Sequence, residues 1–178
     1  GDRIGSDATQ TVAALRTRGG AVEMLTGDRE RPASELAARA GISNWHAEVT
    51  PAEKARRIEA FGRHGHRVLM VGDGINDAGA LAMAHVSIAP GSAADVSQLA
   101  ADMVLRGDAL MPVVEAIGVA RKARRLVLQN FALAAAYNVI AVPIAALGLV
   151  TPLIAAALMA SSSLLVTVNA LRLAGGKV

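Results

Sequence analysis

The feature that most constrains this chain is a run of 46 residues, Leu126 to Leu171, without a single charged side chain. A helix that crosses a bilayer needs about 20 predominantly apolar residues. The run is therefore long enough for two spans and a tight turn, which Thr151-Pro152 supplies. The sequence predicts transmembrane helices at about 129–149 and 153–171. A buried helical hairpin of a soluble protein is the alternative, but helices of soluble proteins normally carry a polar stripe.

Charge is distributed very unevenly along the chain. Residues 1–115 contain 12 Lys/Arg and all 15 Asp/Glu and sum to −3, whereas residues 116–178 contain six Lys/Arg and no acid and sum to +6. The basic residues of the second part lie at Ala120–Arg125, before the uncharged run, and at Arg172 and Lys177, after it. They do not form a folded basic face, so we expect no nucleic-acid partner. By the positive-inside rule, both ends of the hairpin are predicted to be cytoplasmic.

These boundaries predict four segments. Residues 1–115 form a folded domain, 116–128 a basic cytoplasmic helix that leads into the membrane, 129–173 the two spans, and 174–178 a cytoplasmic tail. The chain has no cysteine, which fits a reducing compartment and excludes disulfides and thiolate metal sites within it. It begins at Gly1 without an initiator methionine, and we expect it to be a fragment of a longer protein.

The first 115 residues alternate strand-like and helix-like patterns. The segments "AVEMLTGD" (21–28) and "RVLMVGD" (67–73) are typical of buried strands that end in Gly-Asp turns. Between them a helix start is indicated by Thr50 as N-cap, Pro51 at the first helical position and Glu53 completing a capping box. Further helices are expected at about 31–41, 77–84 and 93–101, and further strands at 86–89 and 102–105. This alternation predicts an α/β fold with a doubly wound parallel sheet.

Three separate segments place polar side chains near the carboxyl ends of predicted strands, where ligands bind in such sheets. Thr26, Gly27 and Asp28 end one strand, Asp73 ends another, and Lys54 sits in the first turn of a helix. A cation is disfavoured at a helix N-terminus by the macrodipole, but it becomes favourable there when an anion such as phosphate binds. A solvated surface lysine is the alternative for Lys54.

The string "VGDGIND" (71–77) is the most specific signal in the chain. The carboxylates of Asp73 and Asp77 are the oxygen ligands that Mg²⁺ prefers beside a phosphate. Gly72 and Gly74 would let the backbone approach the anion closely. Asn76 can donate its amide to a phosphate oxygen. A site for Mg²⁺ and phosphate is therefore expected at this edge of the sheet.

These motifs resemble the heavy-metal-translocating P-type ATPases. The segments "MLTGDR", "TPAEK", "VLMVGDGINDAGALAMAHVSIA" and the whole apolar hairpin are similar, in order and spacing, to the C-terminal third of that family. "IAPGSAADV" and the hairpin most resemble the copper-transporting subclass that supplies copper for cytochrome oxidase assembly. The resemblance implies part of a haloacid-dehalogenase-like phosphorylation domain. For the complete protein it implies ATP-driven export of Cu⁺ through an aspartyl phosphate, with Mg²⁺ and ATP, in the inner (plasma) membrane.

The resemblance also implies roles for single residues. Thr26, with Gly27 and Asp28 in the same motif, would hold the phosphoryl group and Lys54 would neutralise it. Asp73 would ligate Mg²⁺, Asn76 would touch the phosphate, and Asp77 would orient Lys54 and a metal-bound water. The chain departs from the family at Gly79, where a proline is usual, and at Gly5-Ser6, where Arg-Pro is usual.

The chain also lacks the family's phosphorylated Asp-Lys-Thr-Gly-Thr motif, its nucleotide-binding domain, its actuator motif and its Cys-Pro-Cys membrane motif. We therefore expect the isolated fragment to be inactive. Its expected partners are the remaining parts of the same ATPase, including other membrane helices, together with copper and the lipid bilayer.

Polar residues interrupt both apolar spans. Tyr137-Asn138 and the Met-x-x-Ser-Ser pattern containing Met159 match the family's copper-path residues. Met159 and Ser163 are four residues apart and share a helix face, and a thioether is a soft ligand suited to Cu(I). The alternative is that polar residues only join membrane helices, and this is preferred for Ser161, Ser162 and Asn169. No aspartate lies in the last span, where a zinc or cadmium pump would be expected to have one, but copper and silver are not distinguished.

Two other functions compete with this one. A free-standing haloacid-dehalogenase-like phosphatase would need an N-terminal Asp-x-Asp nucleophile motif and no membrane spans. A non-catalytic membrane remnant could bind Mg²⁺ or a partner. His64-Gly65-His66 could suggest a metal site, but its place at a glycine-broken helix end favours a surface turn.

Overall fold

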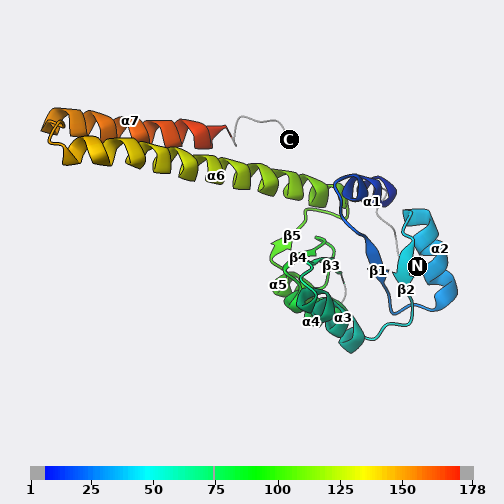
Figure 1. The fold of residues 1–178 in the computed structure, drawn as a ribbon. Coiled ribbons are helices and arrows are strands. Elements are labelled where there is room, and N and C mark those ends of the chain that lie inside the picture. The colour runs from blue at the N-terminus through cyan, green and yellow to red at the C-terminus, as the bar shows by residue number, and fades with distance from the viewer. Residues whose placement is uncertain (1–6, 74, 173–178) are drawn as a thin grey trace. The chain divides into compact units, whose positions relative to one another are not determined.

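The computed structural model describes residues 7–73 and 75–172 (Figure 1). The chain divides into two compact units, Gly1–Val114 and Glu115–Val178. Gly5, Ser6, Gly74, Lys177 and the predicted tail at 174–178 lie outside the described residues.

The first unit alternates helices and short strands, as the sequence predicts. Every strand pair in it is parallel, and the predicted α/β fold is confirmed. Its elements are α1 (Ala8–Thr17), β1 (Glu23–Leu25), α2 (Glu30–Ala40), β2 (Asn44–His46), α3 (Pro51–Arg63), β3 (Leu69–Val71), the 3-10 turn η1 (Ile75–Asp77), α4 (Ala78–Met83), β4 (Val86–Ala89), α5 (Asp95–Ala100) and β5 (Met103–Val104).

The strands form two separate sheets instead of one continuous sheet. One has the order β1-β2, with Leu25 opposite His46, and the other has the order β3-β4-β5, with Val71 opposite Ile88. Among the described residues, no strand pairs with the second edge of β1 or of β3. Parallel strands are normally covered on both faces and paired on both sides near the middle of a sheet, yet Val71 of β3 is 37% exposed. The described strands therefore leave four open sheet edges, and those of β1 and β3 are two of them.

Small apolar side chains form the core between helices and strands. Leu81 of α4 and Ile88 of β4 are almost completely buried, and α2 contributes Ala33 and Ala37. Helix α2 ends at Gly41, whose φ of 73° places it in the left-handed region where glycine carries no steric penalty.

The capping box that the sequence predicts at the start of α3 is confirmed. The Thr50 hydroxyl accepts a hydrogen bond from the Glu53 N–H, and the Glu53 carboxylate accepts one from the Thr50 N–H at 2.8 Å. The Thr50 hydroxyl and N–H together lower the pKa of Glu53. This cap fixes where α3 begins, and so it fixes the place of Lys54 in the first turn.

A distant carboxylate caps the start of helix α6 (Met111–Ala146). The Asp7 carboxylate accepts hydrogen bonds from the N–H groups of Leu110, at 2.9 Å, and Met111, at 2.7 Å. Burial raises the pKa of Asp7, but the N–H groups of Leu110, Met111 and Asp7 itself together lower it by more, and the net shift is downward. The contribution of this carboxylate to stability is complete above the pKa that Asp7 has in the unfolded chain, and it is lost as the pH falls from there through the lowered pKa of the folded state.

The second unit is a helical hairpin formed by most of α6 and by α7 (Pro152–Leu171), which run antiparallel (Figure 1). Both helices are long and apolar enough to cross a membrane. Helix α6 ends at Ala146, three residues before the predicted end of the first span, and Gly148 follows with a φ of 72°. Thr151 caps α7 by accepting a hydrogen bond from the Ile154 N–H.

The two helices of the hairpin meet along a seam of half-buried residues. On α7 these residues recur every three or four positions, as in left-handed helix pairs. On α6 the seam includes Asn130 and Tyr137, and the Asn169 amide donates a hydrogen bond to the Asn130 side-chain oxygen at 2.8 Å. The seam residues of α7 are Ala155, Leu158, Ser162, Val166 and Asn169.

Candidate phosphate and magnesium site

The centre of the candidate site is a buried ion pair between Lys54 and Asp77. The Lys54 ammonium lies 2.8 Å from the Asp77 Oδ1 atom, and each side chain is only 11% exposed. Lys54 comes from the first turn of α3, and Asp77 comes from the end of η1, directly before α4. The pair therefore joins two elements that are distant in sequence, and it excludes a freely solvated lysine at this position.

Gly72 makes room for this pair. A Cβ atom placed on Gly72 would lie 2.8 Å from the Asp77 Cβ, closer than real contacts allow, and 3.1 Å from its Oδ2 atom, which is a tight contact. Any other residue at this position would therefore force Asp77 or the backbone of the loop to shift. The sequence suggested that glycine serves the approach of an anion, and the structure adds a second reason that depends on the fold.

Asp73 lies in the same loop but in a different environment. Its side chain is exposed and has no hydrogen-bond or ion-pair partner among the described residues, while its carbonyl accepts a hydrogen bond from the Ala94 N–H at 3.1 Å. The loop is thus anchored through its backbone and leaves the carboxylate free. Asn76 is also exposed, so both side chains are available to a ligand.

The segment after β1 is held by its own polar groups. The Thr26 hydroxyl donates to the Asp28 carboxylate and accepts from the Asp28 N–H, both at 3.1 Å. The Val49 N–H donates to the Thr26 carbonyl at 2.9 Å, which ties this turn to the segment that leads into α3. A Cβ on Gly27 would meet only the Val49 carbonyl oxygen at 3.7 Å, an ordinary contact. Packing within the described residues thus does not require glycine at this position.

The donor set fits Mg²⁺ in part. Among residues 7–73 and 75–172, no group of three or more His, Asp or Glu side chains is close enough to hold a metal ion by itself. Protein sites for Mg²⁺ commonly supply only one or two carboxylates and leave the other positions to phosphate oxygens and water. The free carboxylate of Asp73 fits that pattern, whereas Asp77 is engaged by Lys54.

The four predicted copper-path residues of the hairpin differ in their exposure. Tyr137 is half-buried beside a cavity of about 120 Å³ that Leu158 also lines, and its buried hydroxyl has no partner among the described residues. Asn138 and Ser163 are exposed, and Met159 is 72% exposed. Within the hairpin, Tyr137 thus lies on the seam, whereas Asn138, Met159 and Ser163 lie on exposed surface.

A second polar cluster was missed by reasoning from sequence. Glu23 of β1 accepts hydrogen bonds from Asn44 of β2 and from Arg57 of α3, and Arg57 also contacts the His46 ring. Arg57 and His46 line an open cavity of about 530 Å³ next to Glu48, the one non-glycine residue with positive φ among those described. No local pattern in the sequence marks these residues, because only the fold brings them together.

Comparisons with known proteins agree with this architecture. The profile of haloacid dehalogenase-like hydrolases matches residues 2–85. Nitrogen fixation protein FixI of Bradyrhizobium diazoefficiens is 57% identical over 167 residues, which cover 93% of this chain and 23% of that protein. A copper-exporting P-type ATPase of Staphylococcus epidermidis is 45% identical over 172 residues, 97% of this chain and 22% of that protein.

Solved structures give the same result. A zinc-transporting PIB-type ATPase in its E2.Pi state superposes with a TM-score of 0.90 at 33% identity, covering 97% of this chain and 28% of that chain. The catalytic domain of the CPx-ATPase CopB-B superposes with a TM-score of 0.59 at 34% identity, covering 61% of this chain and 44% of that one. The chain spans about a quarter of the length of the curated relatives it matches. Through these similarities along nearly its whole length, the chain belongs to the heavy-metal P-type ATPases.

Proposed function

We propose that this chain is the part of an ATP-driven Cu⁺ transporter that binds the phosphoryl group and Mg²⁺ and contributes two membrane helices. The observation that carries the proposal is the buried pair of Lys54 and Asp77, which holds an ammonium group at the strand ends where phosphate sites form. Asp73, four residues before Asp77, has a free carboxylate. Phosphoryl transfer depends mainly on positioned charges of this kind.

The open edges of β1 and β3 support a missing strand between the two sheets. Both strands run parallel to their neighbours, and Thr26 and Asp73 follow their carboxyl ends. One further parallel strand could pair with both edges. Its carboxyl end would then deliver the phosphorylated aspartate beside Thr26, Lys54 and Asp73. We infer that the remaining parts of the ATPase, with the nucleotide-binding and actuator domains, supply this strand.

Within that arrangement each side chain has a defined task. Mg²⁺, when bound, would neutralise charge on the phosphoryl oxygens. Asp73 would be its carboxylate ligand from this chain. Lys54, held by Asp77, would face the phosphoryl oxygens, and Thr26 and Asn76 would donate hydrogen bonds to them. ATP would bind to the domain that this chain lacks.

We assign the transported ion as Cu⁺ and place the protein in the inner (plasma) membrane. The similarity to a copper-exporting ATPase and the soft thioether of Met159 support the ion. The exposed face of α7 that contains Met159 and Ser163 is available to the other membrane helices of the complete protein. The basic residues at the hairpin ends support a cytoplasmic position for the soluble unit and the C-terminus.

The first experiment compares the complete protein with this chain. The complete protein, purified in detergent with Mg²⁺, ATP and Cu⁺, should form a hydroxylamine-labile phosphoenzyme and hydrolyse ATP. The 178-residue chain should do neither, since it lacks the acceptor aspartate. Copper-stimulated ATP hydrolysis by the isolated chain, above that of a Lys54→Ala variant, would contradict the assignment.

Met159→Leu in the complete protein tests the copper path. The change keeps volume and apolarity, so packing alone predicts an effect on stability below about 1.5 kcal/mol. Loss of a soft ligand predicts a lower Cu⁺ stoichiometry. It also predicts that copper activates the ATPase at least about tenfold more weakly than in the wild type. Met103→Leu removes a thioether from β5 of the soluble unit and serves as the matched control. Equal copper affinity and stoichiometry in both variants would reduce Met159 to a packing residue.

A further inference from the structure

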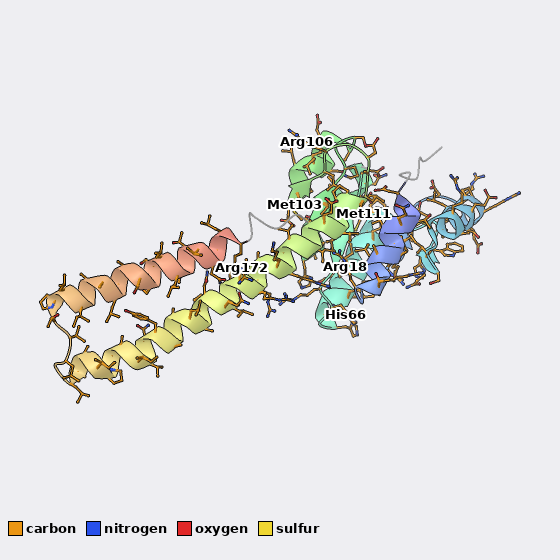
Figure 2. All side chains as sticks on the ribbon, turned by 90° about the horizontal axis from the view of Figure 1, so that it is seen from above. Arg18, His66, Met103, Arg106, Met111 and Arg172 are labelled. Carbon is orange, nitrogen blue, oxygen red and sulfur yellow. The ribbon has the colours of Figure 1, made fainter. Side chains whose placement is uncertain are left out.

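Three arginines form a basic collar at one end of the hairpin. Arg124 and Arg125 belong to α6. Arg172, which Figure 2 labels, follows α7. All three side chains are exposed. We call these three residues the basic collar.

The hydrogen bond between Asn130 and Asn169 sets the three arginines at nearly the same level. With a rise of about 1.5 Å per residue, Arg172 lies about 4.5 Å beyond Asn169, and Arg124 lies about 9 Å before Asn130. Because the helices run antiparallel, both arginines lie on the same side of the hydrogen bond along the hairpin axis. Their distances from it differ by only about 5 Å. Arg172 also donates a hydrogen bond to the Asn169 side-chain oxygen at 3.2 Å, which fixes it on this side of the hairpin.

No acidic side chain of the described residues lies beside the basic collar in sequence: the one Asp or Glu of its unit is Glu115, nine residues before Arg124. Residues 116–178 contain no Asp or Glu. Among the described residues, Arg124 and Arg125 make no hydrogen bond or ion pair, and the partner printed for Arg172 is the neutral Asn169. An uncompensated cluster of guanidinium groups at one level is electrostatically unfavourable, and an anion there would relieve it.

The apolar surface begins directly beside the basic collar. Val127 and Leu128 are 50% and 52% exposed, and the charge-free run starts at Leu126. A ligand that covers both surfaces needs an anionic group next to hydrocarbon. The other usual anchor at this depth, a belt of Trp and Tyr, is missing: the sequence after residue 115 has only Phe131 and Tyr137 as aromatics.

We propose that the basic collar binds the phosphate groups of anionic phospholipids, so that the hairpin selects them over zwitterionic lipids. Guanidinium groups bind phosphate oxygens in pairs of hydrogen bonds, and the lipid chains would cover Val127 and Leu128. The inference rests on the membrane placement proposed above, and it does not depend on copper transport or on phosphorylation. Free nucleic acid or an acidic protein would satisfy the charge but leave the apolar surface uncovered.

The experiment uses the 178-residue chain in detergent and native mass spectrometry of bound lipid. Phosphatidylglycerol and phosphatidylcholine with identical acyl chains are titrated separately, and their dissociation constants are compared. Near an anionic surface each arginine contributes roughly a fivefold gain, or about 100-fold for three. Arg124→Gln/Arg125→Gln/Arg172→Gln should remove the preference for phosphatidylglycerol. The control variant Arg39→Gln/Arg67→Gln/Arg106→Gln removes the same charge from exposed positions of the first unit. It should retain the preference for phosphatidylglycerol.

Further arms separate the possible sources of an anion. A large excess of inorganic phosphate should leave the bound phosphatidylglycerol in place, and its displacement would overturn the lipid assignment. The lipid assignment would also be overturned if a short DNA duplex bound the wild type but did not bind the variant of the basic collar. Co-flotation with phosphatidylcholine vesicles tests the membrane placement itself. A chain that inserts but shows equal affinity for both lipids would refute the basic collar as an anionic-lipid site while leaving the placement intact.

Discussion

Replacing Lys54 with methionine is expected to lower the free energy of unfolding of the soluble unit by about 3 kcal/mol or more. The ammonium group and the Asp77 carboxylate are 2.8 Å apart and both side chains are 11% exposed. Removing one partner leaves a buried, uncompensated carboxylate, which is far more costly than losing an exposed ion pair. Urea unfolding of the full chain in detergent, followed by the fluorescence of Trp45, the only tryptophan, measures the change.

A matched pair on the same helix provides the control. Arg63 and Glu59 also lie 2.8 Å apart, but their side chains are 70% and 41% exposed. Arg63→Met should therefore change stability by less than about 0.5 kcal/mol. In the double variant Lys54→Met/Asp77→Leu, an apolar pair replaces the charges, and most of the lost stability should return. Equal effects of Lys54→Met and Arg63→Met would show that burial does not strengthen the first pair.

Asp73→Asn in the complete protein is expected to reduce the amount of phosphoenzyme formed with Mg²⁺ and ATP by at least about 100-fold. The amide keeps the size of the side chain but removes the charge that a hard cation requires. Because Asp73 is exposed and has no side-chain partner among the described residues, stability should change by less than about 0.5 kcal/mol. The measurements are acid-quenched phosphorylation by labelled ATP across a range of Mg²⁺ concentrations and thermal unfolding of the same sample.

Asp108→Asn is the control for this substitution, since Asp108 is an exposed aspartate outside the phosphate loops. It should leave phosphorylation unchanged. Normal phosphoenzyme in Asp73→Asn at low Mg²⁺ would rule out Asp73 as a ligand. Loss of both phosphorylation and stability would instead indicate a structural role.

The sequence predicted best the features that depend on neighbouring residues. The start of α3 follows from Thr50, Pro51 and Glu53, which act within one turn, and this placed Lys54 correctly in the first turn. The length of the charge-free run predicted two long apolar helices, because this property also depends only on consecutive residues. Helix α1 and strand β2 were not predicted: β2 has only three residues, Asn44–His46, and no alternating pattern of its own.

Contacts between distant residues could not be predicted in this way. Nothing local indicates that Gly72 must leave space for Asp77, because the conflict arises only when the loop folds back. The bond between Asn130 and Asn169 joins residues 39 positions apart and depends on the register of two helices. The strands were expected to form a parallel sheet, but the sequence did not indicate that the described strands would divide into two.

That division has a consequence for the chain when it is made alone. The open edges of β1 and β3 present unpaired N–H and C=O groups, and such edges pair readily with strands of other molecules. Neither edge has the usual protection of a lysine or proline within the strand, since β1 reads Glu-Met-Leu and β3 reads Leu-Met-Val. Copies of the chain at high concentration would therefore aggregate through these edges, and in a cell they would be substrates for chaperones and proteases.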